Sequence, residues 1–453
     1  MQVNNKRVVV VGLGRSGVAT ARFLAKRGAR VTVIDRAPAE KLRGAVDALD
    51  GHAIRFRLGG HDAVDLAQAD LVVLSPGVPH TQPMLEPAWA AGIPVIGEME
   101  LASVFVKAPI IAVTGTNGKT TTTELLGQML KNSGKRVFVG GNIGTPLIAY
   151  ADGAHGVADV IVAETSSFQL DTTVSFRPAT SVLLNITDDH LDRYAGFSAY
   201  AESKWRIFKN QEPEDAAVLN AMDATVVKMM ETHALRSRRR LFSHVPVVQG
   251  ARIQKDRIAV VENRRTTVVF DLAKCHLVGP HNRENIAAAC LAALEHGATL
   301  AGIQQTIDTF RGLPHRVETV GFVRGIRFVN DSKATNVDAV KRALECFDGP
   351  VVLILGGQNK KGDFNRLKTI VRQRVKTLVA LGEARDEIVT ALAGDPQQGV
   401  IEAGSMEEAV AKALSAAVAG DVVLLSPACA SFDMFDNYAH RGECFRSIVE
   451  RLA

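Results

Sequence analysis

The amino-acid sequence predicts an α/β protein of three domains, each built on a largely parallel sheet, with a P-loop nucleotide-binding domain in the centre. Short apolar runs alternate with amphipathic helical stretches along most of the chain, which is the pattern of α/β folds. These runs end in glycine-rich or polar loops, as parallel strands do where ligands bind at their carboxyl ends. Because 453 residues exceed what one hydrophobic core usually organises, we expect domains at residues 1–107, 108–312 and 313–453.

The composition excludes several classes of protein. Hydrophobic residues at 47% and charged residues at 22% are typical of a globular protein and exclude a disordered one. The net charge of +5 is mild, and we interpret the tight basic run at 236–240 as a solvated loop, so no nucleic-acid partner is expected. The five cysteines have no Cys-x-x-Cys spacing, which disfavours both a disulfide framework and a zinc site.

The sequence also gives no indication of a membrane or of export. The N-terminus runs from Lys6-Arg7 directly into a strand-like segment that Arg15 soon follows, which is too short for a signal peptide. No apolar run approaches the length of a membrane-spanning helix. We therefore expect a cytoplasmic protein without a membrane partner.

A glycine motif opens the first domain. The β-branched run at 7–13 leads into Gly12-Leu13-Gly14-Arg15-Ser16-Gly17, a G-x-G-x-x-G motif between a strand and a helix, and Asp35 closes the next strand, 31–34. A carboxylate at this position can bind a ribose hydroxyl, so a nicotinamide-dependent dehydrogenase is one hypothesis. Any other ligand with a diphosphate could use the same turn. Further strands are expected at 71–74 and 94–96.

A second phosphate motif opens the central domain. The apolar run at 110–114 is followed by Gly115-Thr116-Asn117-Gly118-Lys119-Thr120-Thr121 at the start of a helix. The glycines let backbone N–H groups close on a phosphate, Lys119 supplies a positive charge, and the Thr120 hydroxyl can bind Mg²⁺. Val113 occupies the position where the general P-loop has its first glycine, so the loop is a variant. We predict ATP binding.

Three further strands of the central domain end in polar loops, at 136–139, 160–163 and 182–185. Glu164, after the second, could bind Mg²⁺ through oxygen or be a surface carboxylate. His190 follows the third and is flanked by Asp188, Asp189 and Asp192. It could be a metal ligand, an acid/base group or an ordinary loop histidine.

The rest of the central domain carries less chemistry. A helix is expected at 198–210, in which Trp205 and Phe208 pack and the stem of Lys204 covers apolar surface. We interpret the β-branched runs between 213 and 280 as an antiparallel appendage. Asn282 and Asn285 precede the alanine-rich helix at 286–295, where they could bind a nucleotide or cap the helix.

The third domain begins with a hairpin, 317–323 and 326–329. Strands are then expected at 351–355, 377–381 and 422–425, with a helix at 406–418. The loops carry Lys333, Lys360, Lys361 and Ser431. This set is suited to binding an anionic small molecule.

Taken together, the motifs resemble those of the Mur ligases of peptidoglycan synthesis, over essentially the whole chain. The segment Thr114-Gly115-Thr116-Asn117-Gly118-Lys119-Thr120 is similar to the ATP loop of that family, which accounts for Val113. Asn-Asp-Ser-Lys-Ala-Thr-Asn at 330–336 and Ser-Pro-Ala-Cys-Ala-Ser at 426–431 are similar to motifs of the members that add D-glutamate.

The resemblance implies an ATP-dependent amide-bond-forming ligase with ATP and Mg²⁺ as cofactors. Its small-molecule substrates would be UDP-N-acetylmuramoyl-L-alanine and D-glutamate, joined through an acyl phosphate. Cations must neutralise the charge that develops, because the carboxylate, the nucleotide and the amino acid are all anionic. We expect a monomer.

The resemblance also implies roles for individual residues. The catalytic set would be Lys119, Glu164, His190 and Lys204. Lys204 would be carbamylated by CO₂, which turns a cation into a magnesium ligand, so the metal ligands would be Thr120, Glu164, His190 and the Lys204 carbamate. ATP would be bound by Gly115, Thr116, Asn117, Gly118, Lys119, Thr120, Thr121, Asn282, Asn285, Arg316, Asp331 and Lys333.

Two further sets would bind the other substrates. The UDP precursor would be bound by Gly12, Leu13, Gly14, Arg15, Ser16, Asp35, Arg36, Asn142, Ser166 and His190. D-Glutamate would be bound by Thr335, Lys360, Ser431 and Tyr438, with Lys361 as the alternative to Lys360.

Other functions remain open at this point. They are a related ligase that adds another amino acid or a folate glutamate, a nicotinamide-dependent oxidoreductase, and a P-loop protein that uses ATP as a switch. A dehydrogenase has no evident need for the second nucleotide loop at Gly115, and this disfavours it.

Overall fold

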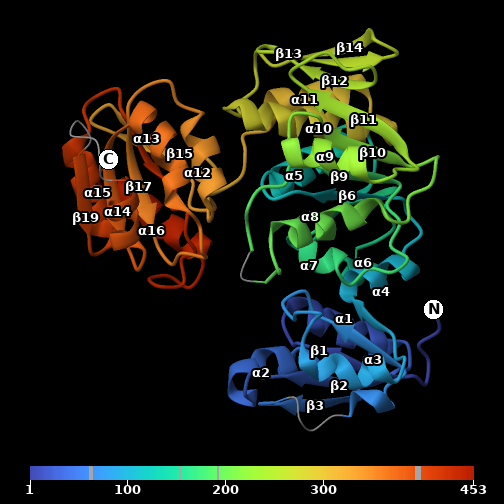
Figure 1. The fold of residues 1–453 in the computed structure, drawn as a ribbon. Coiled ribbons are helices and arrows are strands. Elements are labelled where there is room, and N and C mark those ends of the chain that lie inside the picture. Colours follow the sequence, from blue (N-terminus) through green and yellow to red (C-terminus); the bar gives the residue numbers. More distant parts are fainter. Residues whose placement is uncertain (61–64, 154, 191–192, 393–398, 453) are drawn as a thin grey trace. The chain divides into compact units, whose positions relative to one another are not determined.

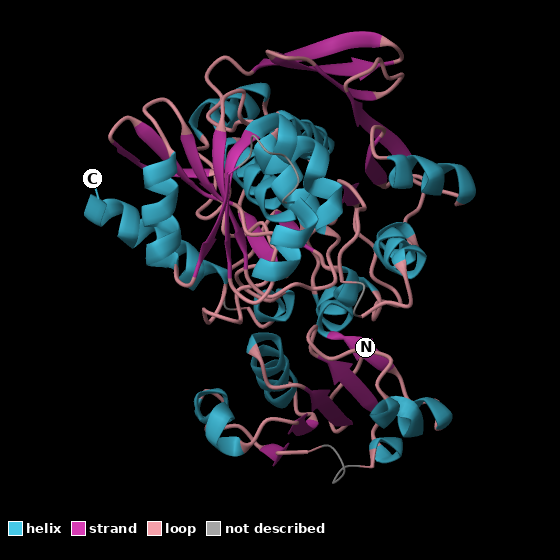
Figure 2. Cartoon of the chain, turned by 60° about the vertical axis from the view of Figure 1, so that its left-hand side comes forward, coloured by secondary structure: helices cyan, strands magenta, loops and turns pink. Residues whose placement is uncertain are grey.

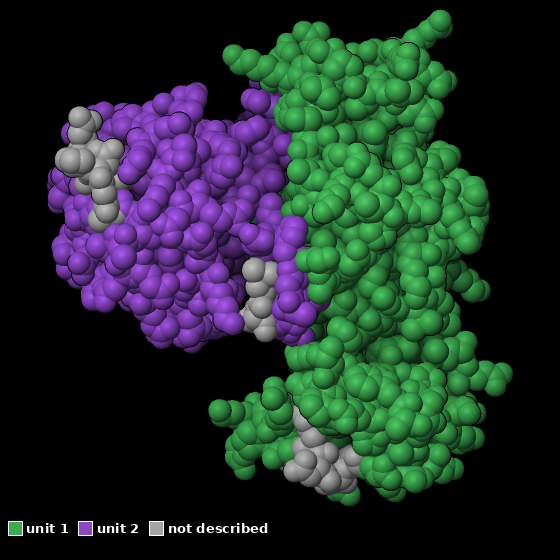
Figure 3. All heavy atoms as spheres, in the orientation of Figure 1, with its two compact units in different colours: residues 1–186, 198–270, 286–306 green, residues 187–197, 271–285, 307–453 purple. Residues whose placement is uncertain are grey.

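The computed structural model describes residues 1–60, 65–153, 155–190, 193–392 and 399–452 (Figure 1). The described residues form three β-sheets with helices between the strands, which confirms the predicted α/β class with three largely parallel sheets. The chain divides into two compact units (Figure 3). Unit 1 comprises residues 1–186, 198–270 and 286–306, and unit 2 comprises 187–197, 271–285 and 307–453.

The first sheet has the order β3-β2-β1-β4-β5, and its pairs are parallel. Its strands are β1 (Arg7–Val11), β2 (Arg30–Asp35), β3 (Ile54–Leu58), β4 (Leu71–Leu74) and β5 (Val95–Gly97). The helices are α1 (Arg15–Lys26), α2 (Ala39–Asp47), α3 (Glu86–Ala90) and α4 (Glu98–Phe105), with 3₁₀ turns at Leu66–Gln68 and Pro83–Leu85. The apolar run of β1 is buried because the strand is central in the sheet.

The second sheet contains the P-loop strand and has the order β14-β13-β12-β11-β10-β9-β6-β8-β7. Its strands are β6 (Ile110–Thr114), β7 (Val137–Gly141), β8 (Val160–Glu164), β9 (Thr180–Leu183), β10 (Ala216–Asn220), β11 (Arg238–Ser243), β12 (Gly250–Ile253), β13 (Arg257–Glu262) and β14 (Arg265–Asp271). The helices are α5 (Lys119–Asn132), α6 (Leu147–Ala151), α7 (Ser167–Leu170), α8 (Phe197–Trp205), α9 (Ala224–Thr232), α10 (Pro280–Glu295) and α11 (Leu300–Thr309), with a 3₁₀ turn at Arg206–Phe208.

Two expectations for this sheet are wrong. The strands after residue 213 are not a purely antiparallel appendage, because β10, β11 and β12 extend the P-loop sheet in parallel and only then does β13 reverse direction. The basic run is not a solvated loop either, since Arg238 and Arg240 lie in β11. Both donate to the Glu295 carboxylate, although the Arg238 side chain is still half exposed.

The third sheet has the order β15-β16-β20-β17-β18-β19. Figure 2 shows the helices and strands of the chain in separate colours. Its strands are β15 (Glu318–Val323), β16 (Ile326–Asn330), β17 (Val351–Gly356), β18 (Val375–Leu381), β19 (Gly399–Ala403) and β20 (Val422–Leu425). The helices are α12 (Val337–Leu344), α13 (Lys368–Arg374), α14 (Arg385–Leu392), α15 (Met406–Ala416) and α16 (Tyr438–Leu452), with a 3₁₀ turn at Phe364–Leu367. The predicted hairpin is confirmed as β15 and β16, which pair antiparallel.

Helices cover both faces of this third sheet. One apolar cluster packs α12, α13 and α14 on one side, and another packs α15 and α16 on the other. The loops at the carboxyl ends of β16, β17 and β20 are thereby held at one edge of the sheet.

Two further observations concern the chain as a whole. Among the described residues, no helix combines the length and the apolar character that crossing a membrane requires. All five cysteines are free thiols.

Candidate functional site

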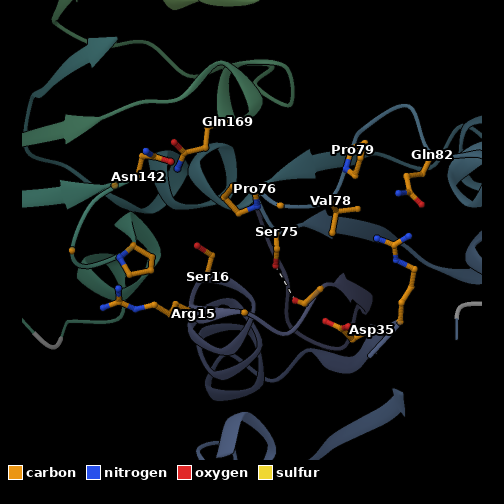
Figure 4. Close-up of a pocket in the computed structure, with 17 residues that line it drawn as sticks. Arg15, Ser16, Asp35, Ser75, Pro76, Val78, Pro79, Gln82, Asn142 and Gln169 are labelled. Carbon is orange, nitrogen blue, oxygen red and sulfur yellow. Dashed lines mark hydrogen bonds between the residues drawn. The ribbon is translucent and has the colours of Figure 1, made fainter. Parts of the chain in front are cut away.

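A cavity of about 470 Å³ lies at the glycine turn between β1 and α1 (Figure 4). Seven of the residues that the resemblance assigns to the UDP precursor line it, namely Gly12, Gly14, Arg15, Ser16, Asp35, Arg36 and Asn142. The other lining residues come from the loop after β4, from the loop after β7 and from α7, all within unit 1. The cavity therefore has a glycine turn on one side and polar groups of the P-loop domain on the other.

The glycine turn is shaped for an anion. Gly12 has a φ of +92°, which side chains rarely adopt, and the Ser75 hydroxyl donates to its carbonyl at 2.8 Å. A Cβ on Gly17 would lie 1.9 Å from the Gly12 carbonyl oxygen, so only glycine lets α1 approach the turn. Gly14 is the N-cap residue of α1 and offers no side-chain cap, which leaves backbone N–H groups of the first turn available to a phosphate.

Asp35 holds this turn in place. Its Oδ2 accepts a hydrogen bond from the Leu13 N–H at 2.7 Å, and its Oδ1 accepts one from the Ala37 N–H at 2.8 Å. The carboxylate thus fixes the backbone on both sides of the cavity floor. Leu13 itself is buried and does not line the cavity.

Two polar side chains, Asn142 and Gln169, line the P-loop side of the cavity. Asn142 lines it and donates from Nδ2 to Glu164 Oε1 at 2.8 Å. Ser166 is not among the lining residues, because it caps α7 in a reciprocal capping box with Gln169. Gln169 lines the cavity instead, and its buried Nε2 has no hydrogen-bond partner among the described residues. Sequence reasoning missed Gln169, although the Ser-x-x-Gln spacing could have indicated it.

The segment that follows β9 holds the P-loop by hydrogen bonds. Gly115 and Gly118 have φ values of +154° and +86°. Asn185 accepts from the Asn117 N–H at 2.8 Å and donates to the Asn117 carbonyl at 3.0 Å, while its own carbonyl accepts from the Thr116 N–H. Asn185 is buried and was also missed as a site residue. This pairing holds the loop in the shape from which α5 starts at Lys119.

Two lysines converge on this loop. Lys119 Nζ donates to the carbonyl oxygens of Gly115 and Thr116, both at 2.8 Å. Lys204 Nζ donates to the same Gly115 carbonyl at 2.9 Å and lies 4.6 Å from the centre of the Tyr200 ring. Lys204 is 1% exposed, so the interpretation of its side chain as one that covers surface with its head in water is wrong. Its amine faces the phosphate loop.

Glu164 is a suitable ligand for a hard cation. It ends β8, is 2% exposed, and has one oxygen, Oε2, that is buried without a hydrogen-bond partner among the described residues. A buried carboxylate oxygen without a partner is unfavourable, and an oxygen-seeking divalent cation would satisfy it. The donor set at the P-loop therefore fits Mg²⁺.

Unit 2 has a separate small cavity, of about 150 Å³, that brings together three predicted residues. His190, Thr335 and Lys360 line it, and Lys361 lines it too. His190 has a φ of +54°, and its neighbour Asp189 accepts a hydrogen bond from Asn336 Nδ2 at 3.1 Å. Asp192 lies outside the described residues.

Tyr438 and Ser431 do not line that cavity but lie on neighbouring parts of unit 2. The Lys333 Nζ is 3.8 Å from the centre of the Tyr438 ring, which is a cation–π distance. Ser431 is buried. The predicted cationic and aromatic groups therefore contact one another within this unit.

Asp331 is buried in unit 2. It accepts hydrogen bonds from the Val317 N–H and from the Ser426 hydroxyl. Burial raises the pKa of the Asp331 carboxyl from 3.8 to about 7. Arg316 directly precedes Val317 in the chain, so Asp331 is hydrogen-bonded to the residue that follows Arg316.

Asn282 and Asn285 lie in the first two turns of α10, which begins at Pro280 rather than at 286. Asn285 Nδ2 donates to Asn282 Oδ1 at 3.1 Å, and Asn282 Nδ2 donates to the Val278 carbonyl. The two amides therefore form one linked polar group at the start of this helix.

Family models cover most of the chain. The model of the Mur ligase middle domain matches residues 113–293, that of the Mur ligase MurD-like N-terminal domain matches 6–97, and that of the Mur ligase glutamate ligase domain matches 315–429. These three matches follow the order of the three sheets.

Full-length relatives agree. A protein of Desulfosudis oleivorans named UDP-N-acetylmuramoylalanine--D-glutamate ligase is 49% identical over 453 residues, covering 100% of this chain and 98% of the relative. A relative of the same name from Desulfatibacillum aliphaticivorans is 47% identical, with 100% of both chains covered.

Solved structures share the fold. A pseudomurein peptide ligase type C from Methanothermus fervidus has a TM-score of 0.63 at 21% identity, covering 99% of this chain and 100% of its own. A UDP-N-acetylmuramate-alanine ligase from Thermotoga maritima has a TM-score of 0.61 at 19% identity, with the same coverage. On the matched family models and the full-length relatives, this chain belongs to the Mur ligase family.

Proposed function

We propose that this chain is an ATP-dependent ligase that joins D-glutamate to UDP-N-acetylmuramoyl-L-alanine. The observation that carries the proposal is full-length identity of 44–49% to relatives that bear that activity in their names. In the reaction, the alanine carboxylate attacks the γ-phosphorus of ATP and ADP leaves. The amine of D-glutamate then attacks the acyl carbon, phosphate leaves, and the amine loses a proton as the amide forms.

The cavity at the glycine turn suits the UDP precursor. The open N-terminus of α1 and the guanidinium groups of Arg15 and Arg36 supply positive potential for a diphosphate. On the opposite wall, Asn142 and Gln169 offer amide groups to the muramoyl part. This wall adjoins the phosphate loop through the bond between Asn142 and Glu164, so a substrate that spans the cavity would extend towards the ATP site.

The P-loop would bind the phosphates of ATP. Lys119 would exchange its two loop carbonyls for phosphate oxygens, and Thr120 and Glu164 would hold Mg²⁺. When bound, Mg²⁺ supplies neutralising charge for the transferring phosphoryl group. Asn185 keeps the backbone donors of the loop aimed at the phosphates before ATP arrives.

Lys204 would act as a carbamate. The neutral amine attacks CO₂, an N–C bond forms, and one proton leaves to solvent, which yields an anionic group with two oxygen donors. Removal from water disfavours a protonated ammonium, and Lys204 is buried beside a second lysine. A surface lysine would stay protonated and would not react.

Residues of unit 2 would bind the amino acid. Lys360 would pair with a carboxylate of D-glutamate, and Thr335, Ser431 and Tyr438 would complete the site, with Lys333 close to Tyr438. Asn282, Asn285, Arg316 and Asp331 would contribute to ATP binding. His190 would assist both the metal and the precursor.

Three wider features belong to the same proposal. The domain limits are 1–107, 108–312 and 313–453, which the three sheets and the three matched segments support. The enzyme acts in the cytoplasm, which its free cysteines support. It works as a monomer, which light scattering at assay concentration would test.

The experiment measures phosphate release from ATP by the purified chain with UDP-N-acetylmuramoyl-L-alanine. D-Glutamate should stimulate release and yield a product heavier by one glutamyl residue. L-Glutamate is the matched control, since it has the same charge and atoms, and it should not stimulate. Stimulation by another amino acid but not by D-glutamate would refute the assignment. Reduction of a nicotinamide cofactor by the chain would instead support the oxidoreductase hypothesis.

A further inference from the structure

Arg441 is a buried cation that has no catalytic assignment above. It lies on α16 and is 2% exposed. Its guanidinium makes four hydrogen bonds: Nε to the Ser332 hydroxyl at 3.0 Å, Nη2 to the Ser332 carbonyl at 2.8 Å, Nη2 to the Cys429 carbonyl at 3.1 Å and Nη1 to the Ala430 carbonyl at 3.3 Å. None of these acceptors is a carboxylate, whereas buried arginines are usually paired with one. The charge is therefore used to hold backbone.

The backbone that Arg441 holds belongs to two loops of the proposed amino-acid site. Ser332 lies in the loop after β16, which also carries Lys333 and Thr335. Cys429 and Ala430 lie in the loop after β20, next to Ser431. Strands β16 and β20 are parallel neighbours, so their loops leave the sheet at the same edge, and the planar fork of one arginine reaches both.

A third loop, the one after β17, is hydrogen-bonded to Ala430, whose carbonyl also binds Arg441. Ala430 and Gln358 exchange backbone hydrogen bonds, each of 2.9 Å, and Gln358 leads into Asn359 and Lys360 after β17. A Cβ on Gly357 would lie 2.3 Å from the Ala430 carbonyl and 3.1 Å from Arg441 Nη1. The loop that carries Lys360 is therefore packed directly against the guanidinium.

The aromatic residue of the site is linked as well. The Ser332 hydroxyl, which accepts from Arg441, donates to the Tyr438 carbonyl at 2.8 Å. The Lys333 Nζ in turn lies 3.8 Å from the centre of the Tyr438 ring. Each loop that carries a residue proposed to bind D-glutamate thus has a residue within one or two contacts of Arg441.

We infer that Arg441 is a positioning residue that fixes the three loops of the D-glutamate site relative to one another. This inference rests on the proposed function. Arg441 acts through the loop carbonyls, so its loss should weaken D-glutamate binding selectively and leave binding of the UDP precursor in unit 1 unchanged. A purely structural role in anchoring α16 would lower stability without that selectivity.

The test compares steady-state kinetics of the wild type and Arg441→Gln for each substrate. In the variant, the KM for D-glutamate should rise by at least about tenfold, because loop carbonyls lose their donor, while the KM for the UDP precursor stays within about twofold. Millimolar guanidinium should partly restore the D-glutamate KM in Arg441→Gly by refilling the vacated space. Thermal unfolding of each variant records its stability.

Ile448→Ala is the matched control. Ile448 lies on the same helix, but its side chain packs in the apolar cluster of α15 and α16 and touches none of the three loops through a hydrogen bond. It should lower the stability of the third domain without a selective change in the D-glutamate KM. An equal rise in Ile448→Ala would overturn the inference, because general destabilisation would then explain the effect.

Other outcomes are also decisive. An unchanged D-glutamate KM in Arg441→Gln refutes the inference and leaves the proposed function intact. If Arg441→Gln does not fold, Arg441→Lys takes its place, since a single ammonium cannot span the same acceptors, and an unchanged KM there refutes the inference as well. Absence of D-glutamate-dependent turnover in the wild type refutes the proposed function and the inference with it.

Discussion

Replacing Glu98 with glutamine should change how the stability of unit 1 depends on pH. Glu98 begins α4, the helix that leads from the first sheet to the second, and is 1% exposed. Its Oε1 accepts from the Ile148 N–H at 2.7 Å, while Oε2 is buried without a hydrogen-bond partner among the described residues. Burial raises the pKa of this carboxyl from 4.5 to about 7.

The sign of the effect follows from proton linkage. Between pH 4.5 and 7 the folded chain holds a proton on Glu98 that the unfolded chain has lost, so rising pH favours unfolding. The contribution of the raised Glu98 pKa to the unfolding free energy is fully present below pH 4.5 and is lost as the pH rises through 7. A shift of this size corresponds to about 3 kcal/mol of unfolding free energy. Glutamine keeps an oxygen for Ile148 and cannot ionise. Between pH 5 and pH 8, which covers most of this range, the unfolding free energy of Glu98→Gln should therefore rise by about 2.5 kcal/mol relative to that of the wild type.

Urea unfolding followed by tryptophan fluorescence is the measurement. Both tryptophans, Trp89 and Trp205, belong to unit 1, so the signal reports this unit. Asp331→Asn is the control, because it removes a carboxyl of similarly raised pKa from unit 2 and should leave this signal's pH dependence unchanged. Unfolding curves of the wild type and Glu98→Gln that stay equally spaced at pH 5 and pH 8 would refute the reasoning.

Three further predictions concern binding and catalysis. Lys204→Ala should abolish ligase turnover, and a short carboxylic acid should restore part of it, whereas full activity in the variant would exclude the carbamate. Asn185→Ala should raise the KM for ATP about tenfold, because the P-loop loses two hydrogen bonds to Asn117, and an unchanged KM would mean that the loop holds its shape without them. Gly17→Ala should raise the KM for the UDP precursor and spare that for ATP, since its Cβ would meet the Gly12 carbonyl at 1.9 Å; a rise in both would indicate general unfolding.

Much of the fold follows from local pattern. Buried apolar runs such as Leu71–Leu74 and Val422–Leu425 coincide with β4 and β20, because a strand covered on both faces is apolar throughout. Edge strands are harder to predict. Strand β3 (Ile54–Leu58) alternates between partly buried and exposed residues, and β19 (Gly399–Ala403) is similarly exposed, so neither has a continuous apolar run. Strand direction after residue 213 was mispredicted because pairing is decided by contacts distant in sequence.

The residues of the candidate site also differ in how well the sequence reveals them. Gly12, Gly17 and Gly115 can be found from sequence, because their roles depend on backbone geometry that only glycine permits. Asn185 and Arg441 could not be found, since an asparagine after a strand or an arginine in a helix has many ordinary explanations. Their importance lies in which distant carbonyls and amides they reach, and no local spacing encodes that.

The carbonyl of Gly115 accepts hydrogen bonds from two lysines of the phosphate-loop region, which would favour the proposed carbamylation of Lys204. Lys119 and Lys204 both donate to this oxygen, at 2.8 and 2.9 Å, so the two side chains would repel each other if both were protonated. Because both nitrogens bind one oxygen, they lie less than about 6 Å apart, and two like charges at that separation repel by about 3 kcal/mol at an effective dielectric constant of about 20. Carbamylation of Lys204 would reverse the sign of this interaction and place an anion beside Lys119. The loop would then hold one cation for phosphate and one anion for magnesium, which separates the two roles between neighbouring lysines.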